Sequence, residues 1–299
     1  MMGTDDIRNK LRAQIGQRPA GALPGAGHKA LEDRLRDQAG EQQEKERAAQ
    51  YAAVDVYLDL DATGSMGYLF RTVLEGAEKI GAELFNHPDR GEIRMSISAV
   101  RDHQEDRGWF EQGVLQSTLE PLQQDITAVR CYGGGGNGGE AYECAWLERA
   151  RSLPQLSGQR KKVVVFAGDD LPHGYKPEYH GLQRFHIGEF DVGCPHQVDY
   201  RTSWQALTTA ADLTLFVGCH QGAYRNDVMV EAQRSIVAVD SPRQKYVALD
   251  NIGDIPALIM AATRLAQSNT AARDYIARLA LEDSGRATRI AGLLGTTKK

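Results

Sequence analysis

The chain has few cysteines and no long apolar run. Cys131, Cys144, Cys194 and Cys219 are spread over 299 residues, without a C-x-x-C pair of the kind that builds zinc ribbons or redox sites. We therefore expect buried free thiols. No apolar run approaches the roughly 18–20 residues that span a bilayer, and the first residues lack the basic and apolar regions of a signal peptide. These absences predict a cytoplasmic protein without a membrane segment.

Histidines and two of the cysteines gather in the second half of the sequence. The set is His173, His180, His186, Cys194, His196, Cys219 and His220. These residue types can hold zinc, but their spacing matches none of the usual structural-zinc patterns. A zinc site among them is therefore a minor alternative to free thiols.

Positive charge is not in excess either. Lys and Arg number 35 against 40 Asp and Glu, which gives a formal net charge of -5. The whole molecule therefore has no electrostatic attraction for nucleic acid, and we do not expect nucleic acid as a partner. A hydrophobic content of 41% and a charged content of 25% are those of an ordinary globular protein.

The first 50 residues differ from the rest. Ile7, Leu11 and Ile15 form a short periodic segment, and residues 29–50 alternate acidic and basic side chains. Such a charged stretch buries little apolar surface by itself. Residues 1–50 are predicted to be a charged helical arm that docks on a partner, or a partly disordered leader.

From residue 51 onward, short apolar strands alternate with amphipathic helices. The predicted strands are 55–60, 93–101, 163–167, 213–217 and 246–249, and the predicted helices are 68–85, 141–152, 203–211 and 255–266. This order predicts a doubly wound α/β domain over residues 51–267, with a mostly parallel central sheet covered by helices on both faces. Residues 268–299 are predicted to add helices that pack on the domain or on a partner.

Oxygen-bearing side chains follow the first predicted strand. Asp59, Asp61, Thr63 and Ser65 lie where this strand ends and a helix begins, the edge at which open α/β sheets bind their ligands. Carboxylate and hydroxyl oxygens suit Mg²⁺, Ca²⁺ or Mn²⁺ better than zinc. A glycine-rich segment that ends at Glu140 and a segment that begins with Asp169 are predicted to reach the same edge.

These elements together resemble a von Willebrand factor A domain, in which a D-x-[ST]-x-S loop follows the first strand and forms a metal-ion-dependent adhesion site. The loop here is Asp61-Ala62-Thr63-Gly64-Ser65. The R-D-H element at 101–103, the glycine-rich loop at 133–140 and the P-H-G ending at 172–174 are similar to a subgroup of kinase-associated and hemicentin-like, extracellular-matrix A domains. The resemblance covers residues 52–266 and implies a Rossmann-like fold.

The resemblance also implies the metal ligands. They are Asp61, Thr63, Ser65, Glu140 and Asp169. Glu140 stands where many A domains have threonine, and Asn137 stands where the subgroup often has aspartate. Either Glu140 contacts the ion or Asn137 holds it through water. The implied ion is Mg²⁺, with Mn²⁺ or Ca²⁺ as alternatives.

A site of this kind favours binding over catalysis. Two hydroxyls and one or two aspartates leave a coordination position for water or for an incoming carboxylate. The resemblance therefore implies a protein–protein interaction module that binds an Asp or Glu of a partner through the ion. It is expected to be a subunit of a larger intracellular assembly and not an enzyme.

A phosphatase is the second hypothesis. The segment Leu58-Asp59-Leu60-Asp61-Ala62-Thr63 is also similar to the D-x-D-x-T start of haloacid-dehalogenase-type phosphatases. In those enzymes Asp59 would attack phosphorus, Asp61 would act as acid or base, and Mg²⁺ would neutralise the phosphate. They also need a lysine on a separate element, whereas Lys161 and Lys162 begin the strand that precedes Asp169.

Overall fold

The computed structural model describes residues 33–34, 37–38, 51–86, 92–103, 108–133, 139–154, 160–182, 193–220, 227–237 and 241–295. The chain divides into two units, residues 1–50 and 51–299, and each is taken by itself. In the first unit the described residues are Asp33, Arg34, Asp37 and Gln38, which are helical and exposed. The rest of the predicted arm, including the segment around Leu11, lies outside the described residues.

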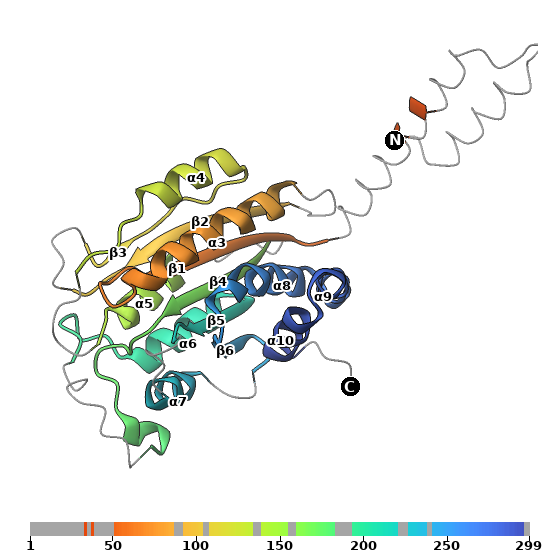
Figure 1. The fold of residues 1–299 in the computed structure, drawn as a ribbon. Helices are drawn as coiled ribbons and strands as arrows, with labels where there is room; N and C mark the ends of the chain where they lie inside the picture. The colour runs from red at the N-terminus through yellow and green to blue at the C-terminus, as the bar shows by residue number, and fades with distance from the viewer. Residues whose placement is uncertain are drawn as a thin grey trace, which may run out of the picture. The chain divides into compact units, whose positions relative to one another are not determined.

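The second unit is built on a six-stranded sheet with the order β3-β2-β1-β4-β5-β6 (Figure 1). The strands are β1 (Ala53–Asp61), β2 (Ile93–Val100), β3 (Phe110–Glu111), β4 (Arg160–Gly168), β5 (Leu213–Gly218) and β6 (Gln244–Ala248). All neighbours pair in parallel except β2 and β3, which are antiparallel. The mostly parallel sheet predicted from the sequence is confirmed, and the short strand β3 is added to it.

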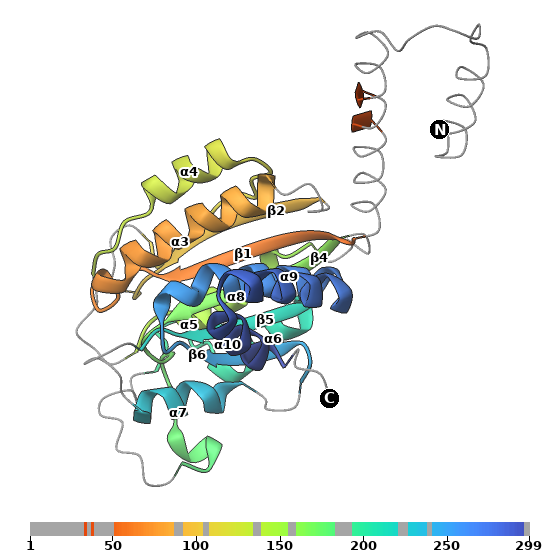
Figure 2. The same cartoon turned by 45° about the vertical axis from the view of Figure 1, so that its right-hand side comes forward.

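Helices cover both faces of this sheet (Figure 2). One face carries α3 (Gly67–Asn86), α4 (Leu119–Ala128) and α8 (Ile255–Gln267), and the other carries α5 (Tyr142–Ser152), α6 (Tyr200–Ala210) and α7 (Asp227–Ile236). In the described part of the chain, two 3-10 turns lie between these elements, η1 (Pro177–His180) and η3 (Ile252–Asp254). Among the described residues, none of the helices is both long enough and apolar enough to cross a bilayer.

The first strand shows how its sequence sorts side chains between the two faces. Val56, Leu58 and Leu60 alternate with Tyr57 and Asp59, and every one of them is buried. The aliphatic set joins the core under α3 and α8, whereas Tyr57 joins the core under α5 and α6. Because side chains alternate along a strand, Asp59 and Asp61 face the α5 side together with Tyr57.

The C-terminal residues form two further helices that pack on the sheet unit. These are α9 (Asn269–Glu282) and α10 (Ser284–Leu294), which lie beside α8 in both views (Figures 1 and 2). Leu279 and Ile290 belong to the same apolar core as α8. The sequence left open whether this segment packs on the domain or on a partner. Its described residues pack on the domain.

Candidate metal centre

The first and the fourth strand end beside each other at the point where the strand order reverses. β1 continues to β2 on one side of the sheet, and the chain later returns to β4 on the other side. Asp61 ends β1, and Asp169 follows β4 directly. In open α/β sheets the crevice at such a reversal is where ligands bind. Both aspartates therefore lie at the expected edge.

A chain of hydrogen bonds joins the side chains of the two loops. Thr63 donates to Asp61 Oδ1 from its backbone nitrogen, at 2.9 Å, and from Oγ1, at 2.6 Å. Thr63 Oγ1 lies 3.1 Å from Ser65 Oγ, and Ser65 Oγ donates to Asp169 Oδ1 at 3.1 Å. Four of the five ligands implied by the sequence are thus brought together.

Backbone contacts hold this first loop in place. Tyr132 N donates to Ala62 O at 3.0 Å, and Gly64 N donates to Gly133 O at 2.9 Å. A Cβ on Gly64 would lie 2.6 Å from Gly133 O, which is too close for any side chain. Tyr132 and Gly133, at the described start of the glycine-rich segment, therefore pack against the backbone of the D-x-T-x-S loop.

Tyr142, which the sequence did not single out, contacts the same site. Its hydroxyl donates to Asp61 Oδ2 and accepts from Asp170 N at 3.3 Å. It is the first residue of α5 and is fully buried. This one side chain links the end of β1 with the segment after β4, and it holds the second carboxylate oxygen of Asp61.

Glu140 lies close to these acids, but its contacts differ from those of the other four residues. Its backbone nitrogen donates to Leu171 O at 2.9 Å, and its side chain is 5% exposed. Its Oε2 has no hydrogen-bond partner among the described residues. The carboxylates of Glu140, Asp61 and Asp169 do not all lie within 4.8 Å of one another. Asn137, the alternative ligand, lies outside the described residues.

Burial raises the pKa of each of these carboxyls, and repulsion between them adds to the shift of Asp169 and Glu140. Burial raises the pKa of Asp61. Burial and then the charges of Asp61 and Asp170 raise the pKa of Asp169 to about 8. Burial and then the charge of Asp61 raise the pKa of Glu140 to about 10. The raised pKa values mean that, among the described residues, these carboxyls are buried together without a positive charge to balance them. With the hydroxyl oxygens beside them, they form the donor set of a hard divalent cation.

Asp59 has a different environment from Asp61, although both face α5. Arg149 Nη2 donates to Asp59 Oδ1 at 2.7 Å, and Arg149 Nε donates to Asp59 Oδ2 at 3.0 Å. Arg149 Nη2 also donates to Ser98 Oγ at 2.7 Å, and the pair is buried. Both oxygens of Asp59 are thus engaged in a structural ion pair.

A second group of polar side chains lies beside the start of α5. His173 Nδ1 is 3.2 Å from Glu143 Oε1, and His173 Nε2 is 3.3 Å from Asp102 Oδ1. Burial lowers the pKa of His173, but the hydrogen bonds with the two carboxylates outweigh it and raise that pKa to about 9. His173 is therefore a buried partner of these acids.

The histidine and cysteine set considered from the sequence is divided by the structure. His180 contacts Tyr200, and His220 contacts Gln233. His186 lies outside the described residues. Cys194 and His196, however, lie next to Cys144 and His103, two residues that the spacing did not connect with them.

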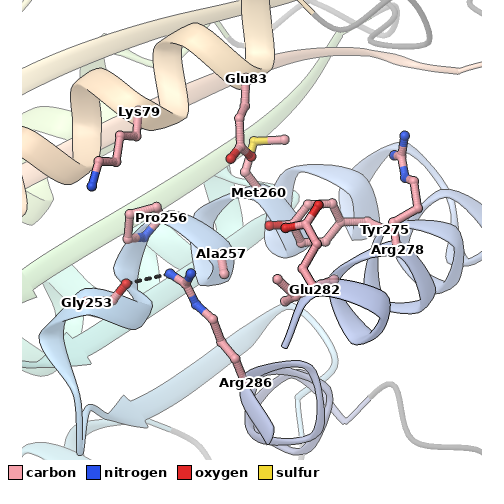
Figure 3. Close-up of a pocket in the computed structure, with 11 residues that line it drawn as sticks. Lys79, Glu83, Gly253, Pro256, Ala257, Met260, Tyr275, Arg278, Glu282 and Arg286 are labelled. Atoms are coloured by element: carbon pink, nitrogen blue, oxygen red, sulfur yellow. Dashed lines mark hydrogen bonds between the residues drawn. The ribbon is translucent and has the colours of Figure 1, made fainter. Parts of the chain in front are cut away.

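A pocket beside the C-terminal helices is separate from the candidate metal centre. This pocket of about 520 Å³ opens between α3, α8, α9 and α10, with Lys79 and Glu83 on one side and Tyr275 and Arg286 on the other (Figure 3). None of its lining residues comes from the loops that carry Asp61 or Asp169.

Comparisons with known proteins show the fold alone. No protein-family model and no curated protein matches the chain. The pilus adhesin SpaC from Lactobacillus rhamnosus GG, in its open conformation, is similar over 72% of this chain and 30% of its own, with a TM-score of 0.50 and 13% identity. A second SpaC structure (TM-score 0.48, 13% identity) covers 75% of this chain and 30% of its own. Proximal thread matrix protein 1 from the mussel byssus (TM-score 0.45, 11% identity) covers 72% and 48%.

This chain therefore spans less than half of each of these structures. At such low identity, the similarity to the adhesin confirms the predicted α/β architecture of the sheet unit, and nothing in it concerns a ligand.

Proposed function

We propose that this protein is a von Willebrand factor A-type module that binds an acidic side chain of a protein partner through a divalent cation. The observation that carries the proposal is the continuous chain of polar contacts from Asp61 through Thr63 and Ser65 to Asp169. It joins two loops at the reversal of strand order, where this fold places ligands. Mg²⁺ is the proposed ion, with Mn²⁺ or Ca²⁺ as alternatives.

The residues present fit a hard cation. Thr63 and Ser65 supply hydroxyl oxygens, and Asp61 and Asp169 supply carboxylates, which are the donors that Mg²⁺ prefers. Asp61 and Thr63 are fully buried, whereas Ser65 is exposed. The centre is therefore anchored on its inner side and reachable from solvent on its outer side. When bound, the ion would supply an electrophilic position for the carboxylate of a partner.

The surroundings of Asp59 favour this function over the phosphatase. A phosphatase of the second hypothesis needs the first aspartate of its motif free to attack phosphorus. Here both oxygens of Asp59 accept hydrogen bonds from Arg149 in a buried ion pair. One protein that shares the fold is a pilus adhesin, so the architecture is compatible with binding. We further propose a cytoplasmic location and a place in a larger assembly.

The first test measures the cation. Isothermal titration of the full chain with Mg²⁺ and with Mn²⁺ should show one binding event, and Asp61→Ala should remove it. Asp212→Asn is the matched control, because Asp212 accepts from Lys162 N at the start of β4, at the opposite end of the sheet from Asp61. Equal Mg²⁺ binding by the wild type and Asp61→Ala would refute the site.

The second test measures the ligand. A display library of acidic peptides, with Asn and Gln versions of the same peptides as controls, is panned on the wild type in Mg²⁺ and in chelator. Binders that need both an Asp or Glu and the cation support the proposal. Acidic peptides that bind equally in chelator would show that the ion takes no part.

A further inference from the structure

Two histidines and two cysteines, the residue types that most often bind zinc, lie together beside the first turn of α5. His103 follows β2, Cys144 is on α5, and Cys194 and His196 lie in the segment before α6. One ligand atom from each of the four lies within 4.8 Å of the others. They come from three separate parts of the chain, and none of them belongs to the proposed Mg²⁺ centre.

The distances within this group are those of a tetrahedral site. Cys144 Sγ lies 3.4 Å from Cys194 Sγ and 3.5 Å from His196 Nδ1. Cys194 Sγ lies 3.6 Å from His103 Nε2. Zinc bonds of about 2.3 Å to sulfur and about 2.0 Å to nitrogen place two sulfurs about 3.8 Å apart and a sulfur and a nitrogen about 3.5 Å apart. The group is therefore close to the spacing that one shared ion requires.

A disulfide explains this arrangement less well. The two sulfurs are not bonded, and all four cysteines of the chain are free. A disulfide would need no imidazole, yet His196 lies next to Cys144 and His103 lies next to Cys194. The centroids of the two imidazole rings are 4.6 Å apart. Thiolate with imidazole is the donor set that selects zinc among the common divalent ions.

We propose that His103, Cys144, Cys194 and His196 bind a structural zinc ion. The ion would tie together the end of β2, the start of α5 and the segment that leads into α6. Glu143 Oε1 lies 3.0 Å from His103 Nε2, the nitrogen that also faces Cys194 Sγ, so this contact would give way when that nitrogen binds zinc. Glu143 would keep its contact with His173. The first turn of α5 would then be fixed by zinc through Cys144 and would present Tyr142 to Asp61.

Metal analysis of the full chain tests the site. The protein is purified under reducing conditions, without chelator, from cells grown with added zinc. It should contain about one zinc per chain after gel filtration. Cys194→Ser and His196→Ala should each lower the content to less than about one fifth of that. Cys219→Ala and His180→Ala are the controls, because both residues lie outside the group, and they should keep the zinc.

Two further measurements keep the result decisive if a variant folds poorly. Cobalt-loaded wild-type protein should show the intense visible bands of tetrahedral Co²⁺ and a thiolate-to-cobalt charge-transfer band; an octahedral spectrum would overturn the proposal. Asp61→Ala should lose Mg²⁺ and keep zinc, which separates this site from the proposed function. Wild-type zinc content in Cys194→Ser and His196→Ala would overturn the site, as would a Cys144–Cys194 disulfide in a protein that takes up no zinc after reduction.

Discussion

Two aspartates that lie two residues apart on one strand receive opposite surroundings. Asp59 is buried against Arg149, which also lies over the ring of Tyr57, at 4.8 Å from guanidinium carbon to ring centroid. Asp61 has no cationic hydrogen-bond partner among the described residues and bonds instead with Thr63 and Tyr142. The first aspartate is neutralised within the fold, whereas the second is not. Under the proposed function, the motif D-x-D therefore combines a structural position with a cation-binding position.

The ion pair of Asp59 and Arg149 gives the first prediction. Arg149→Met leaves a buried carboxylate without its partner and should lower the free energy of unfolding by about 3–5 kcal/mol. The double variant Asp59→Leu, Arg149→Met should recover most of this loss, because no unpaired charge remains. Urea unfolding followed by circular dichroism measures both. Arg151→Met is the control on the same helix, since its side chain is 64% exposed, and a change above about 0.5 kcal/mol there would question the interpretation.

Glu140 gives the second prediction. Threonine there removes a buried carboxylate from the neighbourhood of Asp61 and Asp169, so an ion bound between them keeps more of its charge. At saturating Mg²⁺, Glu140→Thr should bind an acidic peptide about tenfold more tightly, equivalent to about 1.4 kcal/mol. Glu111→Thr is an exposed control outside the centre, and fluorescence anisotropy provides the affinities. Unchanged or weaker binding would mean that Glu140 does not reduce the charge of the ion.

Helix α5 connects the two proposed sites through three consecutive residues. Tyr142 bonds with Asp61, Glu143 bonds with His103 and His173, and Cys144 lies in the proposed zinc group. All three are buried, although the helix begins at the edge of the sheet. The sequence predicted this helix at 141–152, and it spans Tyr142–Ser152. What its first turn touches depends on contacts with residues far away in the chain, and spacing along one helix does not contain that information.

The same limit explains which elements the sequence did not reveal. The strands with long branched runs, such as β4 and β5, were predicted within a few residues of their bounds. Helix α4 was missed because it buries Leu122 and Ile126 alone, too few for a clear stripe. Helix α7 was missed because Gln233 is buried among its apolar residues, where it bonds with His220 and Tyr246. Strand β3 has two residues, which form no pattern.

The loops at the sheet edge show the same division for the candidate site. The positions of Asp61, Thr63, Ser65 and Asp169 followed from a local motif and from the alternation of strands, and the structure brings them together. Tyr142 and the pairing of Cys144 with Cys194 could not be found in this way, since each contact joins residues at least 50 positions apart. The identity of any ion stays a prediction.

The cap between α8 and α9 gives a prediction at the scale of the element. Ser268 Oγ accepts from Ala271 N at 3.0 Å and so satisfies a free amide at the start of α9. Ser268→Ala should lower the free energy of unfolding by about 1 kcal/mol, whereas Ser268→Asp should keep the cap. Chemical unfolding of both variants provides the comparison. Ser284→Ala, at an exposed position on α10, should change stability by less than about 0.5 kcal/mol. Equal losses in Ser268→Ala and Ser268→Asp would show that packing, and not the cap, matters there.

At the scale of the whole molecule, the reversal of strand order makes the proposed metal centre depend on the folded sheet. The loops that supply Asp61 and Asp169 follow β1 and β4, which are neighbours at the middle of the sheet. Unfolding separates these strands and therefore destroys the centre. A cation that binds there binds the native state alone, so its binding free energy adds to the stability of the entire sheet unit.

This linkage gives the last prediction. Free Mg²⁺ at about 100 times its dissociation constant should stabilise the full chain by about 2.7 kcal/mol. Since 1 kcal/mol raises the midpoint of thermal unfolding by about 2–4 °C for a unit of this size, the expected increase is about 5–11 °C. Calorimetry at fixed ionic strength, with Na⁺ in place of Mg²⁺ as the control, separates binding from charge screening. In Asp61→Ala the increase should vanish, whereas in Asp212→Asn it should persist. An equal increase in Asp61→Ala would place the stabilising ion elsewhere, because that variant lacks the carboxylate that Thr63 and Tyr142 hold in position.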